Sequence, residues 1–84
     1  MTRLVYFAWV RERIGKGEED IDLPADVTTG AALLSYLKTL GDGYAHALEH
    51  ESVIRIAINH EHVEHDEPIA GAREIALFPP MTGG

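Results

Sequence analysis

The sequence predicts an α+β fold in which one main helix packs on one face of a mixed sheet of about five strands, with short extra helices. Two patterns carry this prediction. A single stretch has leucines at helical spacing over several turns, and five short runs are rich in residues that favour strands. The chain has 84 residues, 45% of them hydrophobic, which is enough for one core and not for two. We therefore expect one domain over residues 1–84, with residues 79–84 as a flexible C-terminal tail.

The N-terminal part of the chain contains two predicted strands separated by a short helix. Residues 3–8 are apolar and rich in β-formers, which is typical of a buried strand with apolar side chains on both faces. Residues 9–14 predict a short helix that stops at Gly15 and Gly17. Residues 18–23 alternate acidic and apolar side chains. This alternation predicts a strand, and its charges suit the edge of a sheet, where they discourage further pairing.

The main helix is predicted over residues 26–40. Thr28 or Thr29 is suited to cap its N-terminus, and the Gly-Asp-Gly sequence at 41–43 is expected to end it. The apolar stripe that faces the sheet consists of Leu33, Leu34, Leu37 and Leu40. A second short helix is expected over residues 44–50.

Three further strands are predicted in the C-terminal half. Residues 52–59 carry alternating isoleucines, residues 62–64 form a brief returning strand, and residues 74–78 form the last strand. We expect the last strand to pair with the first at the centre of the sheet. The order strand, strand, helix, strand, short strand, strand is that of a β-grasp fold, although order alone also allows other α+β packings.

One face of this sheet is expected to remain open. The face away from the main helix would carry Ala57, Ala76 and Phe78. One of two alternating sets in the first strand would face the same way, either Leu4 with Tyr6 or Val5 with Phe7. Small alanines beside aromatic rings make a flat apolar patch, which a partner protein would cover. The alternative is that residues 44–50 or a loop cover it.

The chain ends in the sequence FPPMTGG, which predicts a rigid exit from the sheet followed by a slender arm. The predicted tail consists of Pro79, Pro80, Met81, Thr82, Gly83 and Gly84. The prolines end the strand, and fully stretched the six residues reach roughly 20 Å. The glycines let the backbone enter a narrow channel, and the carboxylate of Gly84 is then the one reactive group on the arm. A chance Gly-Gly ending is the alternative.

Composition excludes several classes of function. The formal net charge is −7, and the few Lys and Arg residues are scattered, which argues against nucleic acid and favours a basic patch on a partner protein. Cysteine is absent, which excludes disulfides, Cys-ligated metals and thiol nucleophiles and favours the cytoplasm. No stretch has the length of a membrane span, and we interpret residues 4–10 as a buried strand rather than a signal peptide. No Gly-rich phosphate loop is present, so any ATP must be handled by a partner.

These features together resemble a known family. The resemblance is carried by LVYFAWVRERIG, DLPADVTTGAALL, IAINHEHV and DEPIAGAREIALFPPMTGG, and so spans nearly the whole chain. The F-P-P-x-x-G-G ending is its specific part. On these motifs the sequence resembles the ubiquitin-like sulfur carriers that form the small subunit of molybdopterin synthase.

The resemblance implies a carrier that is not itself an enzyme and binds no cofactor tightly. A ubiquitin-activating-type adenylyltransferase would use ATP to adenylate Gly84, and a sulfur-donating sulfurtransferase would supply the sulfur of a thiocarboxylate. The tail would then enter the active site of the molybdopterin synthase large subunit, which supplies the catalytic side chains, and donate sulfur to a pyranopterin phosphate. Family positions that contact partners correspond to Phe7, Arg11, Phe78 and residues 79–84. The chain departs from the family at His62, usually apolar, and at the Ala-Gly-Ala turn over residues 70–72.

Other interpretations remain open at this stage. The same ending suits a protein modifier joined to lysines through Gly84, a sulfur carrier for thiamin or tRNA thiolation, or a noncovalent binding module. Histidines crowd two segments, at 60, 62 and 65 and at 46 and 50. We interpret both as solvated polar segments and expect no functional metal site, although two imidazoles and a carboxylate are able to bind zinc. The acidic runs at 18–20 and 66–67 are interpreted as solvated faces or contacts with a basic partner.

Overall fold

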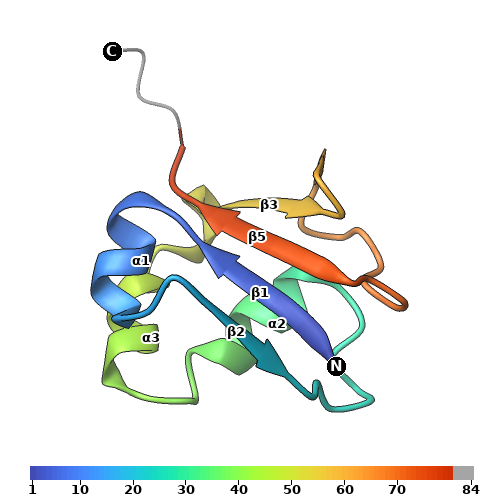
Figure 1. The fold of residues 1–84 in the computed structure, drawn as a ribbon, viewed down its shortest axis with the longest axis horizontal. Coiled ribbons are helices and arrows are strands. Elements are labelled where there is room, and N and C mark those ends of the chain that lie inside the picture. The colour runs from blue at the N-terminus through green and yellow to red at the C-terminus, as the bar shows by residue number, and fades with distance from the viewer. Residues whose placement is uncertain (81–84) are drawn as a thin grey trace.

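The computed structural model describes residues 1–80 of the 84-residue chain (Figure 1). Its elements, in chain order, are β1 (Thr2–Tyr6), α1 (Ala8–Ile14), β2 (Glu18–Ile21), α2 (Gly30–Leu37), α3 (Asp42–Ala47), the 3-10 helix η1 (Glu51–Val53), β3 (Arg55–Ile58), β4 (Glu61–Val63) and β5 (Glu74–Phe78). The strands form one mixed sheet in the order β2-β1-β5-β3-β4. The first and last strands pair in parallel at its centre, and all other pairs are antiparallel. The predicted α+β architecture and central pairing are confirmed.

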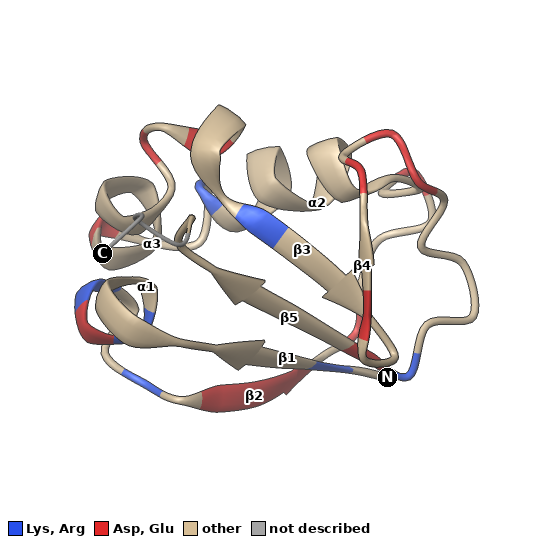
Figure 2. Cartoon of the chain, turned by 90° about the horizontal axis from the view of Figure 1, so that it is seen from above, with Lys and Arg blue, Asp and Glu red and all other residues tan. Residues whose placement is uncertain are grey.

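The first turn of the chain is tight. Ala8 has a φ of 52°, a left-handed conformation that is costly for a residue with a side chain. It redirects the chain from β1 straight into α1, which ends at Gly15 with a φ of 94° as predicted. The chain then returns along β1 as the edge strand β2, with Val5 opposite Glu18. The prediction of an acidic edge strand is confirmed, and Figure 2 shows its charge.

Helix α2 begins beneath the loop that follows β4. The Thr29 hydroxyl accepts a hydrogen bond from the Ala32 N–H at 3.1 Å, which settles the N-cap between the two predicted threonines. The backbone N–H of Ala31 donates to the His65 carbonyl at 2.8 Å. At Gly30 an added Cβ would lie 2.6 Å from Ile56 Cδ1 and 3.1 Å from the His65 carbonyl oxygen. Glycine therefore allows the start of the helix to approach the sheet this closely.

A single apolar core lies between the sheet and the helices. Its buried residues are Leu4, Tyr6, Val10, Leu33, Leu34, Leu37, Ala47, Leu48, Ile54, Ile56, Ile69, Ala72, Ile75 and Leu77. Two predictions about the main helix are wrong in extent. Helix α2 ends at Leu37, so Leu40 leaves the stripe and is 40% exposed. The segment 41–43 does not simply end that helix, because Asp42 and Gly43 already belong to α3.

The helices α2 and α3 cover the same face of the sheet. Both contribute buried residues to the core, and the strand residues that meet them are Leu4, Tyr6, Ile56, Ile75 and Leu77. The alternative that residues 44–50 cover the opposite face is therefore wrong, since Ala47 and Leu48 are buried on the helix side. Over residues 1–80, no helix is both long and apolar enough to cross a membrane.

Candidate functional site

The outer face of the sheet, away from α2, carries the apolar patch that the sequence predicted. Pairing of β1 with β5 places Val5 beside Ala76, and pairing of β3 with β5 places Ala57 on the other side of Ala76. All three side chains are half-buried, and none belongs to the core or packs against it. The structure thereby selects Val5 and Phe7, rather than Leu4 and Tyr6, as the outward set of the first strand.

Two aromatic residues mark the end of this patch. Phe78 is the last residue of β5 and is half-buried. Phe7 is 48% exposed, and its N–H donates to the Leu77 carbonyl at 3.1 Å, which holds it beside the end of β5. The chain leaves the sheet at this point through Pro79 and Pro80, as Figure 1 shows. Apolar surface and the root of the tail therefore lie together, and we call Val5, Phe7, Ala57, Ala76 and Phe78 the outer patch.

The remaining predicted tail residues lie outside the described part of the chain. These are Met81, Thr82, Gly83 and Gly84. Arg11, the other predicted contact, is exposed on α1, and its guanidinium lies over Gly17, where an added Cβ would be 3.2 Å from Arg11 Nε. On the same helix the Arg13 guanidinium carbon lies 4.5 Å from the centre of the Trp9 ring. Helix α1, which follows Phe7 directly, thus carries two arginines in a chain of net charge −7.

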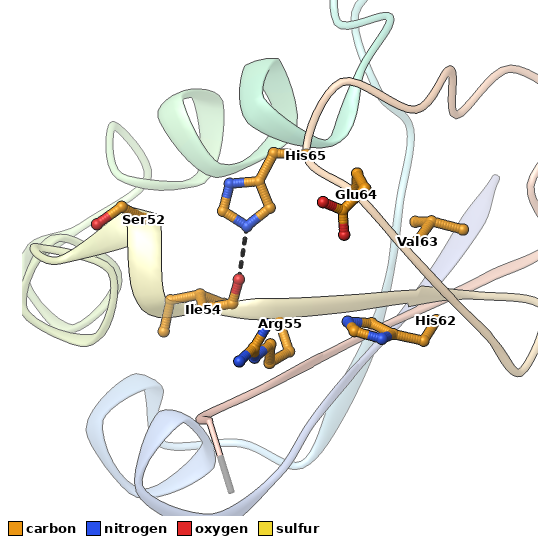
Figure 3. A pocket seen from close by; sticks show the side chains of 7 residues that line it. All are labelled: Ser52, Ile54, Arg55, His62, Val63, Glu64 and His65. Atoms are coloured by element: carbon orange, nitrogen blue, oxygen red, sulfur yellow. Dashed lines mark hydrogen bonds between the residues drawn. The ribbon is translucent and has the colours of Figure 1, made fainter.

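The three clustered histidines have separate surroundings. His60 lies in the two-residue turn between β3 and β4, not on a strand, and its Nε2 is 3.5 Å from Glu74 Oε2. His62 faces outward, with its ring centre 6.1 Å from that of Phe78. His65 Nε2 lies 2.6 Å from the Ile54 carbonyl oxygen, a hydrogen bond that Figure 3 shows. Among residues 1–80, no three His, Asp or Glu side chains are placed to hold a metal ion together.

The interpretation of residues 18–20 as a solvated acidic run is wrong for Glu19. Its carboxylate is only 17% exposed and accepts hydrogen bonds from the Tyr6 hydroxyl at 2.6 Å and the Tyr44 hydroxyl at 2.7 Å. Lys16 Nζ lies 3.2 Å away. The reason is strand parity, because Glu19 shares the inward-facing side of β2 with Ile21. The Glu19 cluster, which we define as Glu19, Tyr6, Tyr44 and Lys16, ties α3 to the edge of the sheet.

The hydrogen bonds of the Glu19 cluster shift its acid–base equilibria. Burial by itself would raise the pKa of the Glu19 carboxyl, but hydrogen bonds from Tyr6, Tyr44 and Lys16 outweigh it and lower that pKa. Burial, followed by the hydrogen bond to Glu19, raises the pKa of Tyr6 far above its usual range. The same two causes raise the pKa of Tyr44. The cluster is therefore held in one protonation state, an ionised Glu19 with two neutral tyrosines, which suits a structural role.

Comparison with known proteins places this geometry in a family. A family model described as the ThiS family matches residues 4–84. The chain belongs to the ThiS family. The molybdopterin synthase sulfur carrier subunit of Escherichia coli K12 is 36% identical over 84 residues, which is all of both chains. That of Dictyostelium discoideum is 37% identical and covers 98% of this chain and 94% of its own length.

The solved structures agree on the fold. Small archaeal modifier protein 1 from Haloferax volcanii superposes with a TM-score of 0.70 at 27% identity, covering 95% of this chain and 97% of that chain. The resemblance to ubiquitin-like sulfur carriers and the β-grasp fold predicted from the sequence are thus confirmed. The ThiS family match also extends to the last residue, so it includes the Gly-Gly ending that the sequence analysis singled out.

Proposed function

We propose that this chain is the sulfur carrier subunit of a molybdopterin synthase and that Gly84 carries the sulfur. The observation that carries the proposal is the ThiS family match through Gly84, on a chain whose last strand leads directly into Pro79 and Pro80. Full-length curated relatives with this role, at 36% and 37% identity, support it. Cysteine is absent, so sulfur held covalently by this chain would sit on the terminal carboxylate.

The proposed chemistry begins on the main chain of Gly84. A carboxylate is a poor acceptor for a nucleophile, so it first attacks the α-phosphorus of ATP on an adenylyltransferase, and pyrophosphate leaves. A persulfide of the sulfurtransferase then attacks the acyl carbon, and AMP leaves. A second thiol cleaves the resulting acyl disulfide and releases the thiocarboxylate. Each catalytic group in these steps belongs to a partner, so this chain is a substrate-like subunit rather than an enzyme.

The outer patch is the proposed docking surface for the large subunit. It combines the exposed Phe7 with half-buried apolar side chains, and the backbone N–H of Arg11 donates to the Phe7 carbonyl at 3.3 Å. A partner that covers the patch also receives the root of the tail, because Phe78 belongs to both. Residues 79–84 reach roughly 20 Å when fully stretched, long enough to enter a buried active site beyond the contact surface. The patch would then supply binding, and Gly84 would supply the reacting group.

The test of the function is sulfur transfer by variants of the C-terminus. Deletion of Gly84, or addition of an alanine after it, is expected to abolish molybdopterin formation in a reaction with the activating enzyme, the sulfur donor and the large subunit. Intact mass spectrometry of the wild-type chain is expected to show one oxygen replaced by sulfur. The circular dichroism spectra of both variants should match that of the wild type, since the described core ends before the tail. Full product formation by either variant would refute the proposal.

The docking surface has its own test. Ala76→Arg places a long charged side chain in the middle of the outer patch and is expected to weaken binding to the large subunit at least about 10-fold. Ala31→Arg is the matched control, because Ala31 is exposed on α2, on the other side of the sheet. Equal binding of both variants would exclude the outer patch as the docking surface while leaving the role of Gly84 intact.

A second candidate function is protein modification through Gly84. The likeness to the Haloferax volcanii small archaeal modifier protein 1 favours it. Activation is the same, but a lysine amine instead of sulfur attacks the acyl adenylate. Covalent adducts of higher mass that contain this chain, lost on deletion of Gly84, would support modification. Their absence, together with a thiocarboxylate on the free chain, would leave sulfur transfer as the function.

A further inference from the structure

A cavity opens beside β3 at the point where its neighbour β4 ends. Its volume is about 280 Å3. The residues that line it are Ser52, Ile54, Arg55, His62, Val63, Glu64 and His65. The cavity exists because β4 pairs with β3 only as far as Val63, and the chain then turns away to cap α2. His65 closes its inner side through the hydrogen bond to the Ile54 carbonyl.

Two side chains that line the cavity, Arg55 and His62, border the outer patch. Figure 3 shows Arg55 and His62 on the same side of β3, with His65 on the other. Pairing of β3 with β5 places Arg55 directly opposite Phe78, and His62 lies against the Phe78 ring at 6.1 Å. Arg55 and His62 therefore flank the root of the tail. The cavity is continuous with the proposed docking surface, where a partner covering Phe78 would also cover Arg55.

Arg55 is an exposed cation of this cavity. In the part of the chain that the structure describes, no ion pair includes Arg55, although Glu64 contributes a carboxylate to the same cavity. Figure 2 shows acidic residues gathered on β2, on β4 and on the loop after it, while the basic residue of β3 stands alone on that strand. Covering an arginine without supplying a negative charge would leave a buried unpaired charge, which weakens binding. A partner that brings an anion to Arg55 would therefore bind this surface more tightly than a partner that does not.

The position of the cavity decides what kind of anion that is. Residues 79–84 reach up to roughly 20 Å, so with the tail stretched into a partner the carboxylate of Gly84 and any nucleotide or pterin phosphate beside it would lie far from Arg55. An anion at the root of the tail belongs instead to the contact surface. We infer that the cavity receives an aspartate or glutamate side chain of the large subunit, paired with Arg55 and bordered by His62. This inference rests on the proposed function.

The proposed ion pair at Arg55 would contribute to specificity for the partner as well as to affinity. The outer patch alone is apolar and would suit any flat apolar surface. A required carboxylate facing Arg55 adds a charge match at its border, and surfaces with a neutral or basic residue at that point lose affinity. His62 gives this border a polar character too. Arg55 is thus the residue proposed to fit this chain to its own large subunit.

The test is the affinity of the full-length chain for the large subunit of the same organism, measured by isothermal titration calorimetry at several salt concentrations. Arg55→Met keeps the aliphatic stem and is expected to raise the Kd at least about 10-fold and to flatten its dependence on salt. Arg55→Lys should fall between Met and wild type. Arg73→Met is the matched control, an exposed arginine at the opposite end of β5 that is expected to change the Kd less than twofold.

The outcomes separate this inference from the proposed function. An unchanged Kd for Arg55→Met, or a loss of affinity with unchanged salt dependence, overturns the pairing with a carboxylate. The function still stands in that case if deletion of Gly84 abolishes sulfur transfer. If the wild-type chain does not bind the large subunit at all, both the function and this inference are wrong.

Discussion

Replacement of Glu19 by alanine is expected to cost this small domain a large share of its stability. The carboxylate accepts hydrogen bonds at 2.6 Å from Tyr6 and 2.7 Å from Tyr44. Each such bond to a charged acceptor is worth about 1.5–3 kcal/mol, and the Tyr6 residue is 1% exposed, so water does not readily replace the lost partner. Relief of the carboxylate's desolvation offsets part of the loss. About 3 kcal/mol remains as the expected decrease in the free energy of unfolding.

This decrease converts into a melting temperature that is easily measured. The entropy of unfolding is about 2.1 cal/mol/K per residue, so for 84 residues 3 kcal/mol corresponds to a decrease of about 17 °C. Thermal and urea unfolding followed by circular dichroism provide two independent measurements. Glu18→Ala is the matched control, because that neighbouring side chain is 60% exposed and, within residues 1–80, forms an ion pair with the half-exposed Arg3. Its expected cost is below about 1 kcal/mol.

The reasoning would be refuted if Glu19→Ala melted within about 5 °C of the wild type, or if Glu18→Ala cost as much. The first result would mean that Glu19 is solvated like the rest of the acidic edge, and the second that its hydrogen bonds do not set it apart from Glu18. Tyr44→Phe extends the test, since it removes one of the two hydrogen bonds and leaves the carboxylate in place. It is expected to lower the free energy of unfolding by about 1.5–3 kcal/mol, the range for one hydrogen bond to a charged acceptor.

Two further predictions concern stability. The lowered pKa of Glu19 contributes stability that is present above the ordinary pKa of about 4.5 and is lost as pH falls through the lowered pKa. The raised pKa of Tyr6 contributes stability that is lost as pH rises above about 10, by up to about 1.4 kcal/mol per pH unit. The free energy of unfolding, measured with urea across pH, should fall at both the acidic and the alkaline end. Tyr6→Phe should reduce the decrease at the alkaline end. Gly30→Ala is expected to cost about 1–2 kcal/mol, because the new Cβ would lie 2.6 Å from Ile56 Cδ1 and 3.1 Å from the His65 carbonyl oxygen. A melting temperature equal to that of the wild type would show that the start of α2 moves away from the sheet without penalty.

The fold was predictable because local patterns and tertiary packing agree over most of the chain. Alternating isoleucines in β3 and the leucines of α2 each have one buried face, so periodicity alone identifies the element and its orientation. The predictions were wrong where the sequence pattern continues past the end of the element in the structure. Leu40 fits the leucine stripe in sequence, but α2 has already ended at Leu37 because the chain must turn into α3. A pattern of residue types does not reveal where packing stops a helix.

The surface around the candidate site was predictable only in part. The Gly-Gly ending and the outward alanines follow from residue type and strand parity. Parity also places Glu19 on the inward side with Ile21, a signal that the sequence contained but that its acidic neighbours obscured. The cavity beside β3 had no such signal, since it results from β4 ending at Val63 and from His65 turning back to the Ile54 carbonyl. Arg55 and His62 come from different strands and meet only through the pairing of β3 with β4, so the sequence alone did not indicate that they share a cavity.

The geometry also separates binding from reactivity within the proposed function. The outer patch and Arg55 lie on the sheet, whereas Gly84, the proposed site of reaction, is six residues beyond Phe78, a separation of up to roughly 20 Å. A contact on the sheet is the same before and during sulfur transfer, so it stabilises ground state and transition state equally. Changes at Ala76 or Arg55 should therefore alter the concentration of large subunit needed for half-maximal rate and leave the rate at saturation unchanged. Changes at Gly84 should remove the rate itself. Affinity for partners, set on the sheet, and the chemistry proposed for Gly84 can thus vary independently.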